Sequence, residues 1–312
     1  MPKNLHTDVR SFWSALYESA YIDVDSKLDR STLERLLMQT DSMFRYREHI
    51  ATTEMPIEYL KGKSVLEIGC GAGSHSALFA YHGARMTSVD LSFQRAAATN
   101  HKFRLLEEKG EQCNALESDA ECLPFLDNSF DIVYSNGVLH HSPDTNAAIA
   151  EAYRVLKPGG RAVIMLYCRS SINFWITMWF GYGILRGGLW RHGVERLGAQ
   201  TEWAGTDAQK IENPITRSYT RDELRAMFSQ FSDIKIRKSD FSIAHMPKIG
   251  KIYHRWLERR GRTHPGGLLP YGSPWPIASR FELWLGQYVG WGWNISAIKP
   301  IAAFHDDRHH RP

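Results

Sequence analysis

The 312-residue sequence is poor in cysteine and in net charge, and each shortage excludes a class of protein. Its four cysteines form no C-x-x-C pair and no Cys/His cluster of the zinc type, so we expect free thiols, a cytoplasmic protein and no metal site. The formal net charge of +4 is too small to indicate nucleic acid as a partner. The N-terminus also lacks the basic and then apolar layout of a signal peptide.

Long apolar runs are missing as well. The stretch SINFWITMWFGYGIL (Ser171–Leu185) carries no charge, but as a helix it would span only about 23 Å, which is short of a bilayer core. Gly181 and Gly183 would weaken a continuous helix further. We therefore expect no membrane-spanning helix here, and interpret the stretch as an apolar roof over a binding site.

Residues 64–168 alternate between short apolar runs and amphipathic stretches, which is typical of strand–helix–strand units in an α/β fold with a parallel sheet. Glycines after the helices suggest left-handed C-terminal caps, and Pro143 suits a first helical turn. The expected helices run over about 74–83, 93–110 and 143–156. The expected strands are Ser64–Gly69, Arg85–Asp90, Asn114–Asp119, Phe130–Asn136 and Arg161–Cys168.

The regions on either side of this core differ from it in their residue patterns and composition. The capping box STLE (Ser31–Glu34) predicts a helix before the core, and TRDE (Thr220–Glu223) predicts another after it. Nine of the ten tryptophans follow residue 168. We divide the chain into a helical cap (1–55), a core (56–168), an aromatic insertion (169–219), a core helix and strand (220–240), a second insertion (241–290), and a final strand with a solvated tail (291–312).

The motif VLEIGCGAGSHS places Gly69, Gly71 and Gly73 where a strand ends and a helix begins. Glycine suits this position because the backbone turns sharply there and must approach a ligand closely. Dinucleotide-binding folds also use such a turn, but their G-x-G-x-x-G pattern would need a third glycine where this chain has Ser74. A nicotinamide dehydrogenase is therefore a disfavoured alternative.

Acidic residues follow this turn in order. Asp90 ends the second expected strand, where a carboxylate can accept hydrogen bonds from both hydroxyls of a ribose. Asp119 ends the third, where it can accept from the exocyclic amine of an adenine, and Glu67 lies under the turn. Each alone would pass for a solvated acid, but the ordered set indicates a nucleoside site.

The segments VLEIGCGAG, SVDLS, SDAECLPFLDNSFDIVYSNGVLHHSPD and EAYRVLKPGGRAVIMLY resemble the class I S-adenosylmethionine-dependent methyltransferases, in the branch with the ubiquinone/menaquinone C-methyltransferases. The resemblance covers about residues 61–168. It implies a Rossmann-like sheet of seven strands whose last strand is antiparallel, expected in GWNISAIKP, and S-adenosylmethionine as cofactor. It also implies cofactor contacts from Glu67, Gly69, Gly71 and Gly73 (methionine part), Asp90 and Leu91 (ribose and adenine), Asp119 and Ala120 (adenine), and Asn136 (amino-acid end).

Catalytic and acceptor-binding candidates surround the expected site. His140 and His141 follow the fourth strand at the carboxyl edge of the sheet, where a histidine can remove a proton. The alternative is that the pair only shapes its loop. Tyr46 is the third catalytic candidate. An arginine at the mouth of the site can bind a carboxylate or phosphate group of an acceptor. The alternative for each tyrosine is a purely structural role, as a partly buried side chain of a helix. The predicted acceptor contacts are Tyr21, Arg45, Tyr167, Arg217 and Tyr219.

The second insertion contains an amphipathic, basic segment. In IGKIYHRWLERRGR, the apolar residues from Ile249 to Leu257 recur at helical spacing, and residues 248–262 have a local net charge of +5. Two interpretations stay open: a lid whose basic face is solvated, or a lid that also makes peripheral contact with the inner face of a membrane.

These patterns lead us to expect methyl transfer to a small or lipid-like acceptor under an aromatic lid. Methylation of a thiol or another compact nucleophile is the alternative reaction, and a non-catalytic, cofactor-binding regulatory or interaction protein is the alternative from another class. Neither the acceptor atom nor the oligomeric state follows from the sequence.

Overall fold

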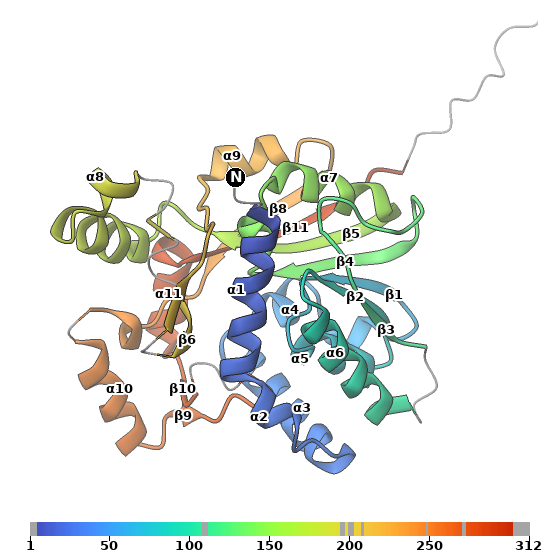
Figure 1. Cartoon of the computed structure of the whole chain (residues 1–312), viewed down its shortest axis with the longest axis horizontal. Helices are drawn as coiled ribbons and strands as arrows, with labels where there is room; N and C mark the ends of the chain where they lie inside the picture. The colour runs from blue at the N-terminus through green and yellow to red at the C-terminus, as the bar shows by residue number, and fades with distance from the viewer. Residues whose placement is uncertain are drawn as a thin grey trace, which may run out of the picture.

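A computed structural model describes residues 5–107, 112–193, 197–198, 203–206, 209–247, 249–269 and 273–301 (Figure 1). The predicted solvated tail falls almost wholly outside these residues, and so does Gly110, one of the glycines expected to cap a helix. Within the described ranges, no helix combines the length and the apolar character needed to cross a membrane.

One seven-stranded sheet forms the centre, in the order β3-β2-β1-β4-β5-β11-β8. The strands β3, β2, β1, β4 and β5 pair in parallel, whereas β11 is antiparallel to both of its neighbours. The predicted seven-stranded sheet with an antiparallel last strand is therefore confirmed. The strands are β1 (Ser64–Ile68), β2 (Arg85–Asp90), β3 (Asn114–Glu117), β4 (Phe130–Asn136), β5 (Leu156–Tyr167), β8 (Ser232–Ser239) and β11 (Gly292–Ile298).

Helices cover both faces of the sheet because the central strands carry apolar side chains on both sides. One buried cluster packs Phe79 of α5 and Phe103 of α6 against the sheet, and another packs Ile149 of α7 and Phe228, next to α9, against the opposite face. Burying each such side chain contributes about 1.5–3 kcal/mol. The covering helices are α5 (Ser74–Tyr81), α6 (Phe93–Leu106), α7 (Thr145–Val155) and α9 (Arg221–Met227).

Among the predicted boundaries in the core, the starts of one helix and one strand are wrong, and β3 ends at Glu117, before the predicted Asp119. Helix α7 starts at Thr145, because the Asp144 carboxylate accepts hydrogen bonds from the amides of Asn146 and Ala147 and so caps it. Pro143 therefore precedes the helix. No glycine caps its other end, since the chain passes directly into β5, which starts at Leu156, earlier than predicted.

Within the described residues, four α-helices and one short 3-10 helix precede the sheet: α1 (Leu5–Ala20), α2 (Ile22–Asp25), α3 (Arg30–Tyr46), α4 (Ile50–Thr53) and η1 (Ile57–Tyr59). The capping box predicted at Ser31 is wrong. Asp29 is the N-cap of α3, and its carboxylate accepts a hydrogen bond from the amide of Thr32 at 2.7 Å. The capping box at Thr220 is confirmed. Helix α1 runs across the front of the molecule in Figure 1, and several of its side chains line the cavity described below.

The aromatic-rich segments are inserted between the last elements of the sheet. The first, between β5 and α9, holds a wide helix with π-type hydrogen bonding, η4 (Asn173–Leu185), then α8 (Gly188–His192) and a hairpin of β6 (Trp203–Thr206) and β7 (Gln209–Glu212). The second, between β8 and β11, holds η7 (Ile243–His245), α10 (Gly250–Arg259), β9 (Thr263–His264), β10 (Trp275–Pro276) and α11 (Arg280–Val289).

Candidate active site

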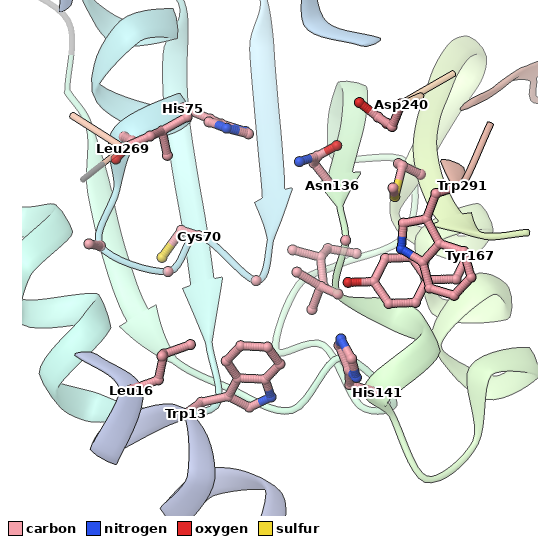
Figure 2. A pocket seen from close by; sticks show the side chains of 18 of the residues that line it. Trp13, Leu16, Cys70, His75, Asn136, His141, Tyr167, Asp240, Leu269 and Trp291 are labelled. Carbon is pink, nitrogen blue, oxygen red and sulfur yellow. The ribbon is translucent and has the colours of Figure 1, made fainter. Parts of the chain in front are cut away.

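A cavity of about 620 Å³ lies at the carboxyl ends of β1, β2 and β4 (Figure 2). One part is lined by the glycine turn and the strand-end acids. The other is a mainly apolar chamber closed by α1 and by both insertions, with Arg47 and Asp240 among its polar lining residues. Its lining includes Val9, Phe12, Trp13 and Leu16 from α1, Ile172 and Ile176 from the first insertion, and Phe241, Trp275 and Trp291 from the segment after β8.

The glycines of the turn serve two different purposes. Gly71 lines the cavity with a φ of 56°, and a Cβ there would meet only the Arg95 guanidinium, at 3.6 Å, so the turn stays open toward the cavity. Gly73 has a φ of 81° and does not belong to the lining. A Cβ at Gly73 would lie 2.9 Å from the Cα of Thr99, so this glycine allows α5 and α6 to pack closely.

Asp90 joins the turn to the end of β2. Its carboxylate accepts from the amide of Gly71 at 2.9 Å and from the amide of Ser92 at 3.0 Å. The two carboxylate oxygens offer about four acceptor positions, so two remain for a ligand. Asp90 is buried, its position is fixed by the two amides, and it lines the cavity.

Asp119 lines the neighbouring part of the cavity, and so do Leu91 and Ala120. One carboxylate oxygen accepts from the amide of Glu121 at 2.9 Å, and the other lies 2.8 Å from Nδ1 of His6. His6 belongs to α1, so this contact ties the N-terminal helix to the end of the cavity where we expect an adenine.

Glu67 lies beneath the turn and is 2% exposed. Its carboxyl group is hydrogen-bonded to the Ser76 hydroxyl, and burial, followed by the charge of Asp90, raises its pKa to about 8. His75 lies beside it, with Nδ1 3.7 Å from a Glu67 oxygen, and burial lowers the pKa of His75 to about 4. Both groups are therefore mainly neutral at pH 7, and a cationic ligand here would favour loss of the Glu67 proton.

His141 projects into the cavity from the loop after β4 (Figure 2). Its Nδ1 lies 2.9 Å from the carbonyl oxygen of Ile215. Nδ1 also lies 3.1 Å from the Asn213 amide nitrogen and 3.2 Å from the Thr216 hydroxyl. The Ile215 carbonyl oxygen is the nearest of the three and can only accept, so we assign the ring proton to Nδ1 on this shortest contact, which places the lone pair on Nε2. In this tautomer His141 is arranged to accept a proton.

His140 lies behind this wall and does not line the cavity. Its ring is fully buried and stacks on Tyr167 with 3.7 Å between ring centres. Burial lowers the pKa of His140 well below its usual range. Tyr167 does line the cavity, and the centre of its ring lies 4.4 Å from that of Trp291. His140 therefore packs behind the aromatic wall of the cavity, on the side away from the cavity.

Of the other predicted residues, Tyr21 and Asn136 line the cavity, and four lie elsewhere. Arg45 pairs with Asp41 and Glu58 on an outer surface, and Tyr46 is half exposed. Arg217 donates to the Ser142 carbonyl oxygen, and the Tyr219 hydroxyl donates to Thr145. We therefore leave Arg45, Tyr46, Arg217 and Tyr219 out of the candidate site.

Several features of the lining were not predicted from the sequence, in which Arg47 is only one of three candidates in the run MFRYREH, beside Arg45 and Tyr46. Arg47 follows the last residue of α3 and turns inward, where it pairs with Asp240 at 3.1 Å and lies over the ring of Trp275. Nothing in the sequence links residues this far apart. By contrast, Val9, Phe12, Trp13 and Leu16 recur at helical spacing, a signal that predicts one common face of α1.

A seven-stranded sheet in this order, with an open glycine turn, Asp90 at the end of β2 and Asp119 just beyond β3, is the arrangement expected of a methyltransferase of the S-adenosylmethionine-dependent class. A model of the methyltransferase domain family matches residues 66–164. Ubiquinone biosynthesis O-methyltransferase of Pseudomonas putida is 36% identical over 176 residues, which cover 51% of this chain and 73% of the relative. The chain belongs to the class I S-adenosylmethionine-dependent methyltransferases, and S-adenosylmethionine is its cofactor.

Other similarities are more partial. Phosphoethanolamine N-methyltransferase 2 of Caenorhabditis elegans is 33% identical over 123 residues, which cover 39% of this chain and 28% of the relative. The chain thus spans less than a third of that protein. A solved structure of Haemonchus contortus phosphoethanolamine N-methyltransferase 2, with S-adenosylhomocysteine bound, has a TM-score of 0.48 at 18% identity and covers 85% of this chain and 57% of that one.

Proton release is expected when S-adenosylmethionine binds near Glu67. Because the pKa of this buried carboxyl is about 8 without a cation, the positive ligand should displace its proton between about pH 6 and 8, and affinity should rise by up to about tenfold per pH unit in that range. Calorimetry in buffers of different ionisation enthalpy measures the released proton. In Glu67→Gln both effects should vanish, and a wild-type protein that releases no proton would contradict this linkage.

Proposed function

We propose that the protein transfers a methyl group from S-adenosylmethionine to a hydroxyl group of a small apolar or lipid-like acceptor, with His141 as the general base. The observation that carries this proposal is one continuous cavity that joins the glycine turn and Asp90 to an apolar chamber, with His141 on its wall.

The composition of the chamber supports an apolar acceptor. Phe12 and Trp13 come from α1, while Ile172, Ile176 and Trp291 come from the insertions. An apolar acceptor gains free energy by leaving water for such walls. Among the relatives, the name ubiquinone biosynthesis O-methyltransferase suits this chamber better than the name phosphoethanolamine N-methyltransferase does.

The protein's own residues have three tasks in this reaction. When bound, S-adenosylmethionine supplies an electrophilic methyl carbon attached to a sulfonium. The turn at Gly71, with Asp90 and Asp119, would hold the nucleoside and methionine parts, and Tyr167 and Trp291 would position the acceptor. Helix α1 and η4 exclude water, and Nε2 of His141 would receive the hydroxyl proton.

A panel of acceptors tests this proposal, with release of S-adenosylhomocysteine as the readout. We expect turnover with phenols that carry an alkyl or prenyl chain, and much slower turnover with phosphoethanolamine or a small thiol. Turnover restricted to the thiol or the amine would contradict the proposed acceptor class. Cofactor binding without turnover on any member of the panel would favour the non-catalytic alternative.

A further inference from the structure

Helix α11 exposes a row of aromatic side chains. Phe281, Trp284 and Tyr288 are 58%, 53% and 60% exposed, and their rings contact one another with centres 5.9 Å and 5.3 Å apart. The opposite side of the helix, at Glu282 and Gly286, is buried against the protein. The fold therefore fixes the helix and leaves the row pointing outward.

Helix α10 presents a second apolar edge beside basic residues. Ile252 is 71% exposed and Trp256 is 43% exposed, although Leu257 on the same helix is buried. A hydrogen bond of 3.2 Å from the Tyr253 hydroxyl to Glu282 holds α10 against α11. Basic residues outnumber acidic ones here, since Glu258 is the single acid. The exposed basic residues of α10 and of the turn after it are Lys251, Arg255, Arg259, Arg260 and Arg262.

The first insertion adds a third apolar element on the same side of the molecule. In Figure 1, α8, α11 and α10 follow one another along the side away from α6. Lys238 connects these parts, because its ammonium donates to the carbonyl oxygens of Ser170, just before η4, and of Tyr288. The exposed apolar side chains here are Trp175, Ile176, Phe180 and Leu185 of η4 and Trp190 of α8.

We propose that this surface, which we call the aromatic face, docks on an anionic phospholipid bilayer. Tryptophan and tyrosine suit the boundary between head groups and acyl chains, and the basic residues of α10 complement anionic head groups. A symmetric contact with a second copy would set this basic helix near its own copy, where like charges repel. The aromatic face consists of Trp175, Ile176, Phe180, Leu185, Trp190, Ile249, Ile252, Trp256, Phe281, Trp284 and Tyr288, with the five basic residues named above.

The aromatic face also borders the cavity. Ile176 both lines the cavity and is 41% exposed, and Thr177 beside it belongs to the lining as well. One helix, η4, therefore separates the chamber from the surface that we place on the bilayer. This step rests on the proposed function: a lipid-like acceptor would enter from the membrane beside η4.

Flotation of the full chain with vesicles tests the docking. We expect binding to vesicles of phosphatidylcholine with phosphatidylglycerol at low salt, release at high salt, and little binding to phosphatidylcholine alone. The charge variant Arg255→Glu/Arg259→Glu and the aromatic variant Phe281→Ser/Trp284→Ser should each bind at least about tenfold more weakly. The matched controls Lys61→Glu/Lys63→Glu and Tyr59→Ser, exposed positions at and before the start of β1, should bind like the wild type.

Absence of wild-type flotation on anionic vesicles at low salt would overturn the proposal. A second result would also overturn it: light scattering shows that the wild type dimerises without binding vesicles, and both aromatic-face variants abolish this dimerisation. Transfer to a detergent-dispersed acceptor is measured in parallel, because it does not need the bilayer. Normal transfer without flotation contradicts the docking alone, and flotation without transfer contradicts the proposed function alone.

Discussion

Replacement of Asp90 by alanine is expected to weaken binding of S-adenosylmethionine by at least about 100-fold. Two hydrogen bonds from ribose hydroxyls to a charged acceptor contribute about 1.5–3 kcal/mol each, and tenfold in affinity corresponds to about 1.4 kcal/mol. The same substitution removes the acceptor for the amides of Gly71 and Ser92, so the turn also loses its support. Titration calorimetry with the purified variant measures the loss.

A matched variant separates binding from stability. Asp131 also accepts from a backbone amide, that of Ser64 at 2.8 Å, and pairs with Lys157, but it lies at the opposite edge of the sheet. Asp131→Ala should lower the melting temperature and leave cofactor affinity unchanged. If Asp90→Ala binds S-adenosylmethionine as tightly as Asp131→Ala does, the placement of the ribose at Asp90 is wrong.

The second large effect is expected from His141→Ala. Loss of a general base typically lowers the rate by about 10²–10⁴-fold, whereas the affinity for S-adenosylmethionine should change little. The Ile215 carbonyl that orients the ring remains in place, so added imidazole should restore part of the activity. Steady-state turnover and cofactor calorimetry on the same preparation provide both readouts.

His101→Ala serves as the control, because it removes a histidine of α6 that does not line the cavity. It should keep wild-type turnover. A His141→Ala enzyme with turnover within about threefold of the wild type would rule out the base role, because general bases contribute far more than this. The residue would then be a part of the cavity wall.

The cofactor half of the site was largely predictable from local patterns. The turn residues and Asp90 lie at strand ends, and Asp119 lies just beyond the end of β3. Because parallel strands bring their carboxyl ends to one edge, sequence order alone predicts that these side chains meet. Gly73 is the exception within this motif. Its part in the packing of α5 against α6 depends on Thr99, a contact that the motif does not encode.

The acceptor half was predicted less well because its walls come from segments distant in sequence. Arg45 and Tyr46 looked equivalent to Arg47 in the run MFRYREH, yet only Arg47 of these three faces the cavity, because α3 ends at Tyr46 and the chain turns there. Its partner Asp240 follows β8, almost two hundred residues later. No periodicity within one segment can predict such a pair.

Hydrophobic periodicity and the glycine-turn motif were thus enough to predict the parallel α/β core and a nucleoside site, because these depend on local residue patterns and on short-range backbone geometry. The antiparallel last strand and S-adenosylmethionine were implied by the resemblance of the motifs to the methyltransferase family. Only the tertiary structure decided which aromatic residues enclose the chamber and which are left on the surface. The apolar side of α10 looked uniform in the sequence, but burial of Leu257 and exposure of Ile252 and Trp256 divide it. That division depends on how α10 packs on α11, and packing between distant segments is a property of the folded chain.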